Sequence, residues 1–274
     1  MTDQYGVIGH PISHSKSPVI HAEFARQTGQ DMTYQAIDIL PAALASSLDK
    51  LFHEGIKGLN VTVPHKKAVV ELMDDLSERA RLAMAVNTIS VLDDKRVVGD
   101  NTDGLGLVRD LSHNLRFEIQ DADILILGAG GATCGIIPSL LEAEPRQIVI
   151  ANRTVQRAEE LAREFGPQGA KLGDIGACGF DVLNDRHFDL IINATSAGLG
   201  GEVPPFPKSI LSPDVTCYDL SYAMKPTPFV AWAAANGAKK VHQGWGMLVE
   251  QAAAAFHIWR GVEPDTRSIR ANLP

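Results

Sequence analysis

The segment Ile124–Ala132, ILILGAGGA, joins a run of apolar residues to a glycine-rich turn. Gly128, Gly130 and Gly131 carry no side chain that would keep a ligand away from the backbone N–H groups. A helix that begins at such a turn adds the positive end of its dipole, and the two features together suit a pyrophosphate. The segment therefore predicts a dinucleotide site near the middle of the chain.

The elements expected around this turn form one βαβ unit. Residues 124–127 are typical of a buried strand, residues 132–143 of a helix and residues 147–151 of a second strand. Thr133 stands where the G-x-G-x-x-G pattern has its third glycine. A tight strand-to-helix turn without a ligand is the alternative that the motif alone leaves open.

The residues after the second strand indicate which dinucleotide binds. NAD sites usually carry an acid there, which binds the ribose hydroxyls. This chain has Asn152-Arg153-Thr154, with Arg157 close behind. Guanidinium and hydroxyl donors bind a 2′-phosphate, which a carboxylate would repel. The sequence therefore predicts NADP(H), not NAD(H); a pair of solvated surface arginines is the alternative.

Polar residues also stand at the ends of strands expected in the first hundred residues. Asn60 and Thr62 alternate with valines along an expected strand at 59–63 and share one face of it, near Lys66. Asn87 precedes another strand, and Asp103 lies at a strand-to-helix transition, where open α/β sheets meet their ligands. A half-exposed strand, turn chemistry and a helix N-cap are the respective alternatives.

Ser15 and Ser17 place two hydroxyls beside the start of an expected helix at 18–28. Ser17 suits the N-cap position, with Pro18 at the first helical position. Free hydroxyls at a helix N-terminus also suit a substrate carboxylate. The two roles are compatible.

Composition excludes several classes of partner. The 274 residues are 45% hydrophobic and 21% charged, with a net charge of −8, so we expect neither nucleic acid nor a membrane surface as a partner. Cys134, Cys178 and Cys217 are widely spaced and indicate neither a disulfide framework nor a metal site. The N-terminus lacks the pattern of a secretory signal, so we expect a cytoplasmic protein.

The pattern of elements predicts an α/β protein with two domains. Strand and helix signals alternate over residues 5–63, and a hairpin at 88–98 turns at 93–95. Strands near 190–193 and 216–220 continue a doubly wound sheet after the βαβ unit. We expect the last apolar helix, 247–260, to pack back on the first domain; completion of the second domain is the alternative.

These segments together resemble the shikimate dehydrogenase family. The matching blocks follow the family order over nearly the whole chain: residues 5–9 with 14–18, 60–62 with Pro64 and Lys66, 85–88, 101–104, 128–132, 152–154, 193–198 and 246–251. Met84, Cys134 and Met224 depart from the family pattern, which has glycine, arginine and proline at these positions.

The resemblance implies an NADPH-dependent, reversible reduction of 3-dehydroshikimate to shikimate, in the chorismate pathway to aromatic amino acids. The expected architecture is an N-terminal α/β substrate domain, residues 1–103 with 242–274, and a Rossmann-like NADP-binding domain, residues 104–241. The expected partner is a small-molecule substrate, and the expected assembly is a monomer or homodimer. An NAD-using quinate/shikimate dehydrogenase and a non-catalytic, nucleotide-responsive binding protein are the alternatives.

The resemblance also implies roles for individual residues. Lys66 and Asp103 would form the catalytic pair, and which of them transfers the proton stays open. The residues implied to bind the substrate are Ser15 and Ser17 at its carboxylate, Tyr222 nearby, and Asn60, Thr62, Lys66, Asn87, Asp103 and Gln251 around its ring. Those implied to bind the cofactor are Gly128, Ala129, Gly130, Gly131, Ala132, Asn152, Arg153, Thr154, Arg157, Thr195, Ser196, Gly244 and, near the nicotinamide, Met247.

Overall fold

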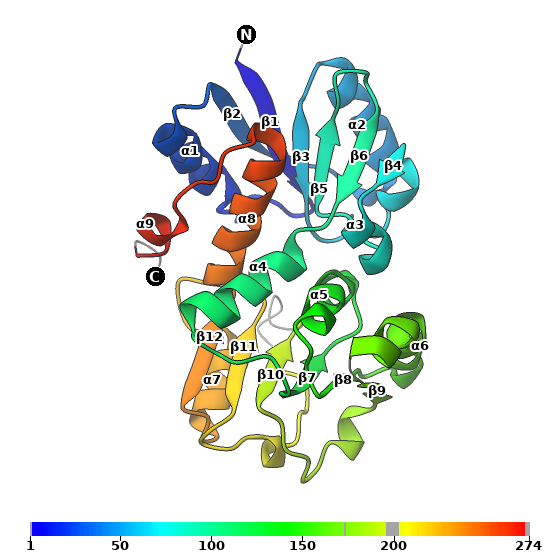
Figure 1. Ribbon diagram of the computed structural model, residues 1–274, viewed down its shortest axis with the longest axis vertical. Coiled ribbons are helices and arrows are strands. Elements are labelled where there is room, and N and C mark those ends of the chain that lie inside the picture. Colours follow the sequence, from blue (N-terminus) through cyan, green and yellow to red (C-terminus); the bar gives the residue numbers. More distant parts are fainter. Residues whose placement is uncertain (1, 173, 196–202, 272–274) are drawn as a thin grey trace. The chain divides into compact units, whose positions relative to one another are not determined.

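The computed structural model describes residues 2–172, 174–195 and 203–271, with the backbone alone for 168–172 (Figure 1). The chain divides into two compact units. Unit 1 comprises Met1–Leu107 and Leu248–Leu273, and unit 2 comprises Val108–Met247. The chain therefore leaves unit 1 after Leu107 and returns to it at Leu248, a few residues beyond each of the predicted domain boundaries.

Unit 1 is built on one mixed sheet. Its strands are β1 (Asp3–Gly9), β2 (Met32–Asp38), β3 (Gly58–Val61), β4 (Asp75–Leu76), β5 (Thr88–Val91) and β6 (Val97–Asp100). In the described residues they lie in the order β2-β1-β3-β5-β6-β4. β1 pairs in parallel with β2 and β3, whereas β5 runs antiparallel to β3 and β6. The predicted hairpin is confirmed, with its turn between β5 and β6.

Helices cover both faces of this sheet. They are α1 (Ser17–Thr28), α2 (Leu44–His53) after a 3-10 turn η1 (Pro41–Ala43), α3 (Glu78–Ala83), α8 (Trp245–Arg260) and α9 (Thr266–Arg270), with a 3-10 turn η2 (Val70–Leu72). Leu44 and Leu48 of α2 pack on one face with Ile8, Leu59 and Val61. On α8, Val249, Ala252 and Phe256 pack against Ile20 and Phe24 of α1. The predicted return of the last long helix to the first unit is confirmed.

Unit 2 is a doubly wound sheet. Its strands are β7 (Asp123–Leu127), β8 (Gln147–Ala151), β9 (Asp174–Cys178), β10 (Leu190–Asn193), β11 (Thr216–Asp219) and β12 (Lys240–Gln243). Their order in the described residues is β12-β11-β10-β7-β8-β9, and every pair is parallel. This is the order of a Rossmann fold, with its reversal between β7 and β10, where such sheets bind nucleotides. The predicted fold class is confirmed.

The helices of unit 2 follow the strands in alternation (Figure 1). They are α5 (Gly131–Glu142), α6 (Val155–Leu172) and α7 (Pro228–Ala235), with 3-10 turns η4 (Phe180–Val182) and η6 (Lys208–Ile210). Helix α4 (Asp103–Arg109) carries the chain from unit 1 into unit 2 and continues into a π-helical turn, η3 (Asp110–Asn114). A π turn is rare and frequently marks a functional site.

Two local predictions are wrong. Helix α1 begins at Ser17 itself, its N-cap residue is Lys16, and no side chain caps it. Ser17 is therefore not the N-cap, and Ser15 Oγ instead accepts a hydrogen bond from the Ser17 N–H at 3.3 Å. Strand β3 ends at Val61, and Thr62 lies beyond it. All four β3 residues are buried, so the polar–apolar alternation does not mark a half-exposed strand.

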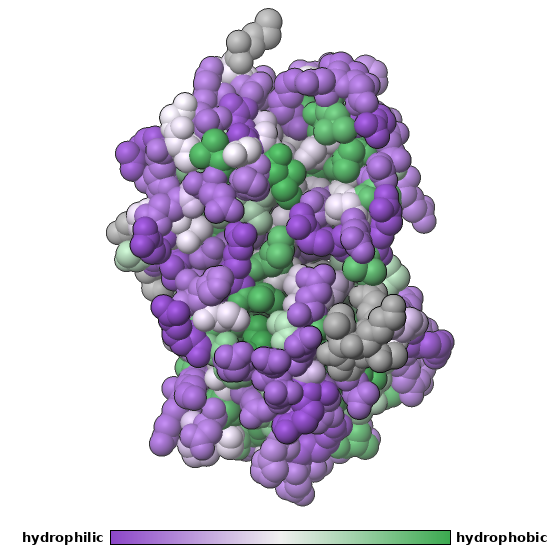
Figure 2. All heavy atoms as spheres, in the orientation of Figure 1, coloured by the Kyte–Doolittle hydropathy of each residue, from purple (hydrophilic) through white to green (hydrophobic). Residues whose placement is uncertain are grey.

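The surface agrees with the charged composition. The face drawn in Figure 2 is covered largely by hydrophilic residues, and hydrophobic residues gather in smaller areas. Large exposed apolar side chains are scattered over separate parts of the chain, among them Val19, Val182 and Met224. Within the described ranges, we find no helix with the length and apolar character needed to cross a membrane.

Met84, one of the departures from the family pattern, occupies a left-handed conformation. It follows the last residue of α3 with φ 49° and ψ 33°, and its N–H donates to the carbonyl of Arg81. Residues with a Cβ pay a steric cost in this region, whereas glycine does not. The glycine usual at this position thus has a physical reason, and this chain carries the strain instead.

We expect the free energy of unfolding of Met84→Gly to be about 1 kcal/mol higher than that of Met84→Ala. Both variants lose the side chain beyond Cβ, and only glycine relieves the strain. Urea unfolding of the two variants measures the difference. Equal stability would mean that the left-handed turn costs this chain nothing.

Candidate active site

Lys66 and Asp103 form a buried ion pair in unit 1. Lys66 Nζ donates to Asp103 Oδ2 at 2.5 Å. The side chains are 14% and 5% exposed, respectively. Two charges removed from water to this degree need close partners, and each is the other's nearest one. The structure therefore brings together two residues that lie 37 positions apart in the sequence.

The turn that carries Lys66 is fixed by hydrogen bonds on both sides of it. His65 is fully buried, and its Nε2 lies 2.7 Å from the carbonyl oxygen of Ile39. The carbonyl of Lys66 accepts from the N–H of Val86 at 2.8 Å. His65 lies between Pro64 and Lys66 of a matching block but was not predicted as a site residue. Its burial beside a lone backbone acceptor is visible only in the fold.

Asp103 is the first residue of α4 and is positioned by Asn101. The Asn101 side-chain oxygen accepts from the Asp103 N–H at 3.0 Å, and its amide donates to the carbonyl of Ala85 at 2.9 Å. Asn101 thus ties the end of β6 to the residues before β5. Because Asn101 bonds to the backbone N–H of Asp103, both carboxylate oxygens of Asp103 stay available to other side chains.

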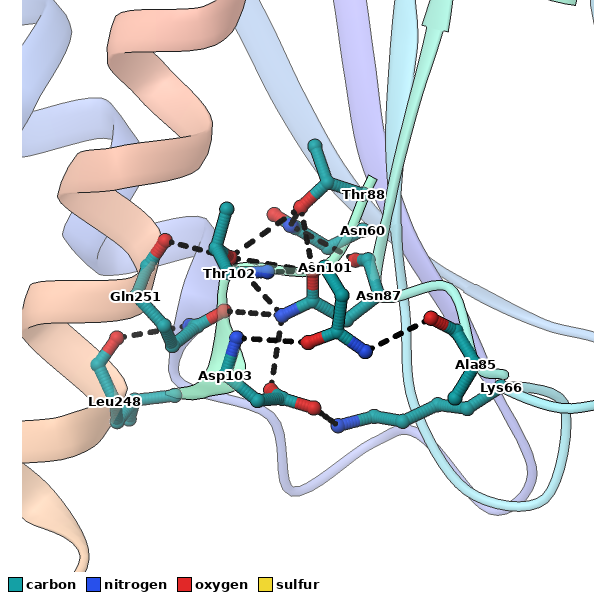
Figure 3. A network of polar contacts seen from close by, with 10 residues as sticks. All are labelled: Asn60, Lys66, Ala85, Asn87, Thr88, Asn101, Thr102, Asp103, Leu248 and Gln251. Atoms are coloured by element: carbon teal, nitrogen blue, oxygen red, sulfur yellow. Dashed lines mark hydrogen bonds and ion pairs between the residues drawn. The ribbon is translucent and has the colours of Figure 1, made fainter. Parts of the chain in front are cut away.

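Asn87 is the centre of the polar network drawn in Figure 3. Its Nδ2 donates to Asp103 Oδ1 at 2.8 Å and to Thr102 Oγ1 at 3.0 Å. Its Oδ1 accepts from the Thr102 N–H and from Thr88 Oγ1, both at 2.8 Å. The side chain is 2% exposed. Buried amides are stable only when both ends are satisfied, and this one is.

Helix α8 contributes Gln251 to the same network. The Gln251 Oε1 lies 3.3 Å from Asn87 Nδ2, and its Nε2 donates to the carbonyl of Leu248 at 2.8 Å. Thr102 Oγ1 reaches the Gln251 carbonyl oxygen at 3.1 Å. Gln251 is 9% exposed, so it is no ordinary surface glutamine. Thr88 and Thr102 belong to the network although the sequence did not single them out.

Asn60 joins the network from the other side. Its Nδ2 donates to the Asn87 carbonyl at 3.2 Å and lies 3.3 Å from Thr88 Oγ1, and its Oδ1 accepts from the Tyr34 hydroxyl at 2.7 Å. Tyr34 in turn stacks on His21 with ring centroids 4.1 Å apart. Burial lowers the pKa of His21 to about 3, so the ring is neutral. Asn60 is therefore held in one orientation.

The other residues predicted to bind the substrate come from the start of α1, the end of β3 and unit 2. Ser17 is buried and Ser15 is half-buried, both at the start of α1 in unit 1, and Thr62 follows β3. Tyr222 belongs to unit 2, where its ring lies 4.5 Å from that of Trp245. The structure thus joins Asn60, Lys66, Asn87, Asp103 and Gln251 in one network.

The glycine turn follows β7 at the reversal of the unit 2 sheet. Gly128 has φ +107°, and a Cβ there would lie 3.1 Å from the backbone of Ala194, which follows β10. Gly130 is exposed, precedes α5, and would place a Cβ in open space. Thr133, where a third glycine is usual, is fully buried and donates to the Gly128 carbonyl at 2.9 Å. The Thr133 hydroxyl therefore holds the turn by a hydrogen bond, at a position where a third glycine would allow close packing of helix and strand.

Arg153 and Arg157 lie after β8, at the start of α6. Both are exposed, and in the described part of the chain neither forms an ion pair. Asn152 Nδ2 donates to the Thr154 carbonyl at 2.8 Å, and this bond orders the turn that contains Arg153. Two unpaired guanidinium groups beside an ordered turn suit an anionic group.

The remaining residues predicted to bind the cofactor surround the ends of β10 and β12. Thr195 donates from its hydroxyl and its N–H to Asn193 Oδ1, at 2.7 and 3.2 Å. A Cβ at Gly244 would overlap the carbonyl of Leu220, and Met247 is 8% exposed in α8. Ser196 lies outside the described residues. In the described ranges, no cluster of three or more metal-ligating side chains occurs.

Family models match the chain in consecutive segments. Residues 7–89 match a model described as the shikimate dehydrogenase substrate binding domain. Residues 110–199 match one described as shikimate/quinate 5-dehydrogenase, and residues 244–273 match the shikimate 5′-dehydrogenase C-terminal domain.

Individual proteins are similar over almost their full length. The shikimate dehydrogenase (NADP(+)) of Methylococcus capsulatus is 53% identical over 271 residues, which cover 99% of this chain and 96% of that protein. An Ael1 enzyme from Pseudomonas putida has a structure with a TM-score of 0.89 at 40% identity, covering 99% and 98% of the two chains. Shikimate 5-dehydrogenase from Thermus thermophilus, solved with NADP(H) and shikimate, gives 0.85 at 32% identity, covering 98% and 97%.

The Thr133 hydroxyl offers a test of how the glycine turn is held. Thr133→Val removes the hydroxyl at nearly constant volume and leaves the Gly128 carbonyl buried without its donor, so we expect a loss of about 1–3 kcal/mol in unfolding free energy. Thr133→Ser keeps the hydroxyl and loses only one methyl group, about 0.8 kcal/mol. Urea unfolding compares them; a serine variant as unstable as the valine variant would contradict this role.

Proposed function

The chain belongs to the shikimate dehydrogenase family, and we propose that it catalyses the reversible reduction of 3-dehydroshikimate to shikimate with NADPH, in the chorismate pathway. The observation that carries the proposal is the buried pair of Lys66 and Asp103 at the edge of a fully polar network. An ammonium held within such a network can stabilise and protonate the oxygen of a ketone as it is reduced.

The residues of unit 2 fit NADP. The exposed Gly130 and the N-terminus of α5 suit the pyrophosphate, and Arg153 and Arg157 carry no acid partner among the described residues and suit the 2′-phosphate. Bound NADPH supplies the hydride that reduces the substrate carbon. Thr195, Gly244 and Met247 are proposed to complete the site, Met247 beside the nicotinamide.

Lys66 is proposed to be the proton donor in the direction of reduction. Its Nζ spends one N–H on Asp103 and has two others for the carbonyl oxygen of the substrate. Asp103 accepts from Lys66 on one oxygen and from Asn87 on the other, so it orients the ammonium and balances its charge. In the reverse direction the neutral amine takes the proton of the alcohol back.

The polar network suits a ring that carries several hydroxyl groups. Asn60 Oδ1 and both Asp103 oxygens keep lone pairs that accept from a hydroxyl, and Gln251 Nε2 keeps one N–H. We further propose that Ser15 and Ser17 bind the substrate carboxylate at the start of α1, with Thr62 and Tyr222 as additional contacts. We expect the enzyme to act in the cytoplasm as a monomer or homodimer.

Oxidation of NADPH by the purified protein on addition of 3-dehydroshikimate tests the function directly. Turnover no greater than the background rate would refute it. A comparison of NADP with NAD, and of shikimate with quinate, tests the broader alternative, which fails if NADP is preferred and quinate is not oxidised.

Lys66→Ala removes the proposed proton donor. We expect kcat to fall by about 10²- to 10⁴-fold while the Kd for NADPH changes little, because Lys66 lies in unit 1. Stopped-flow rates and fluorescence titration of NADPH measure the two quantities. An unchanged kcat would remove Lys66 from the mechanism.

Lys66→Arg separates charge from proton transfer, since arginine keeps the charge and the N–H donors but does not release a proton. A kcat as low as that of the alanine variant assigns the proton to Lys66. Recovery towards the wild-type rate would leave Lys66 as a charge stabiliser alone.

Arg153→Ala removes one proposed contact of the 2′-phosphate. We expect KM for NADPH to rise at least about tenfold and KM for NADH to change little, because only NADPH carries that group. Arg163→Ala is the matched control, since Arg163 is exposed further along α6, and it should alter neither value. An equal loss for both cofactors at Arg153 would mean a structural arginine.

A further inference from the structure

A buried cluster in unit 2 joins the two places where the chain enters and leaves that unit. Asp110 follows the first crossing by three residues and lies in the π turn η3. Met247 is the last residue before the second crossing and lies in the first turn of α8. Tyr218, in the middle of β11, lies between them. The mechanism proposed above uses neither Asp110 nor Tyr218.

Tyr218 bridges the two crossings with a single hydroxyl. It donates to Asp110 Oδ2 at 2.6 Å and accepts from the Met247 N–H at 3.3 Å. Its side chain is fully buried, and that burial, with the nearby Asp110 carboxylate, raises the pKa of the phenol well above its ordinary value. The hydroxyl therefore keeps its proton and always donates to Asp110.

Asp110 lies directly against the backbone of α8. A Cβ at Gly246 would overlap the Asp110 carboxylate, and the three atoms nearest to it are all in that group. Asp110 Oδ1, the carboxylate oxygen that does not bond to Tyr218, accepts from Asn114 Nδ2 at 2.8 Å. Gly246 is therefore glycine because a carboxylate occupies the space of its side chain.

The charge of Asp110 suits this place. The first turn of α8 contains no acidic residue of its own, and its unpaired N–H groups carry a partial positive charge. Burial lowers the pKa of the neighbouring His242, although the Asp110 charge opposes that effect, so a protonated imidazole is not the counter-charge. Asp110 thus supplies from another element the acid that the helix lacks.

We propose that Asp110 and Tyr218 are positioning residues for hydride transfer: they fix the first turn of α8 so that Met247 lies where the nicotinamide binds. The inference rests on the proposed function, in which Met247 is the nicotinamide contact. Gly246 is part of the same arrangement, since it admits the carboxylate. A displacement of about 1 Å at a contact of this kind costs up to about 10²-fold in rate.

Tyr218→Phe removes only the bridging hydroxyl. We expect kcat per NADPH-binding site to fall by about 10- to 100-fold, with KM for 3-dehydroshikimate nearly unchanged, because the hydroxyl bonds to Asp110 and Met247 and to none of the residues proposed to bind the substrate. Counting sites by titration with NADPH removes any loss that comes from unfolded protein. Tyr5→Phe is the matched control: it also deletes a buried phenol hydroxyl, which accepts from Arg260 in unit 1, and it should keep the wild-type kcat per site.

A double-mutant cycle tests the contact between Asp110 and Gly246. Gly246→Ala should lower kcat per site as Tyr218→Phe does, because its Cβ displaces the carboxylate. In the Asp110→Ala background the same change should cost nothing more, since the overlapping atoms are gone. A full, additive loss in that background would overturn the arrangement.

The two proposals fail differently. A wild-type protein that does not reduce 3-dehydroshikimate refutes the proposed function and this inference with it. A wild-type protein that turns over, together with a Tyr218→Phe variant of equal kcat per site, leaves the function intact and refutes the positioning role alone.

Discussion

The cost of burying an ammonium and a carboxylate governs the structure of unit 1. Each charge withdrawn from water loses several kcal/mol of solvation, which the partner charge offsets only if the remaining polar atoms are also satisfied. Asp103 meets that condition, because Lys66 donates to one of its oxygens and Asn87 donates to the other. Every further residue of the network is needed because Asn87 is itself a buried polar group.

A series of hydrogen bonds in this network runs in one direction, towards Asp103. The Tyr34 hydroxyl donates to Asn60, Asn60 to Thr88, Thr88 to Asn87, and Asn87 to Asp103. Each donor is polarised by the next acceptor, and the chain ends on the one negative charge. Unit 2 contains the same device on a smaller scale, where Asp219 is buried and accepts from Asn193, Thr227 and the Ser221 N–H. Burial raises the pKa of Asp219, and these donors oppose that effect.

The sequence predicts those structural features that depend on residues close to one another along the chain. The strands at 147–151 and 190–193 were predicted to the residue, because parallel strands buried on both faces are continuous apolar runs. Strand β12 was not predicted, because it begins with a charged residue, Lys240, and ends with a polar one, Gln243. It lies at the edge of the sheet. Ser17 was misplaced as an N-cap because Ser and Pro in sequence cannot show that the helix starts one residue earlier.

Contacts between distant residues lay beyond the sequence for a different reason. Gly246 reads as an ordinary glycine at a helix start until Asp110, from a π turn far upstream, is found against it. The family resemblance named Lys66, Asp103 and Gln251, but it did not state that Thr88 and Thr102 saturate Asn87. Hydrogen-bond saturation is a property of the assembled core, and no local pattern encodes it.

Saturation also bears on how the proposed substrate would be oriented. Both N–H groups of Asn60 are spent on the protein, and those of Asn87 are shared among protein acceptors, so neither amide has a donor to spare for a ketone oxygen. A ketone oxygen only accepts, whereas a ring hydroxyl can donate to Asn60 Oδ1 or to Asp103. Within the network, Lys66 and Gln251 keep unspent N–H groups, and only Lys66 can also give up a proton. In the proposed reaction, the absence of other spare donors would therefore direct the ketone to Lys66 as much as its charge would.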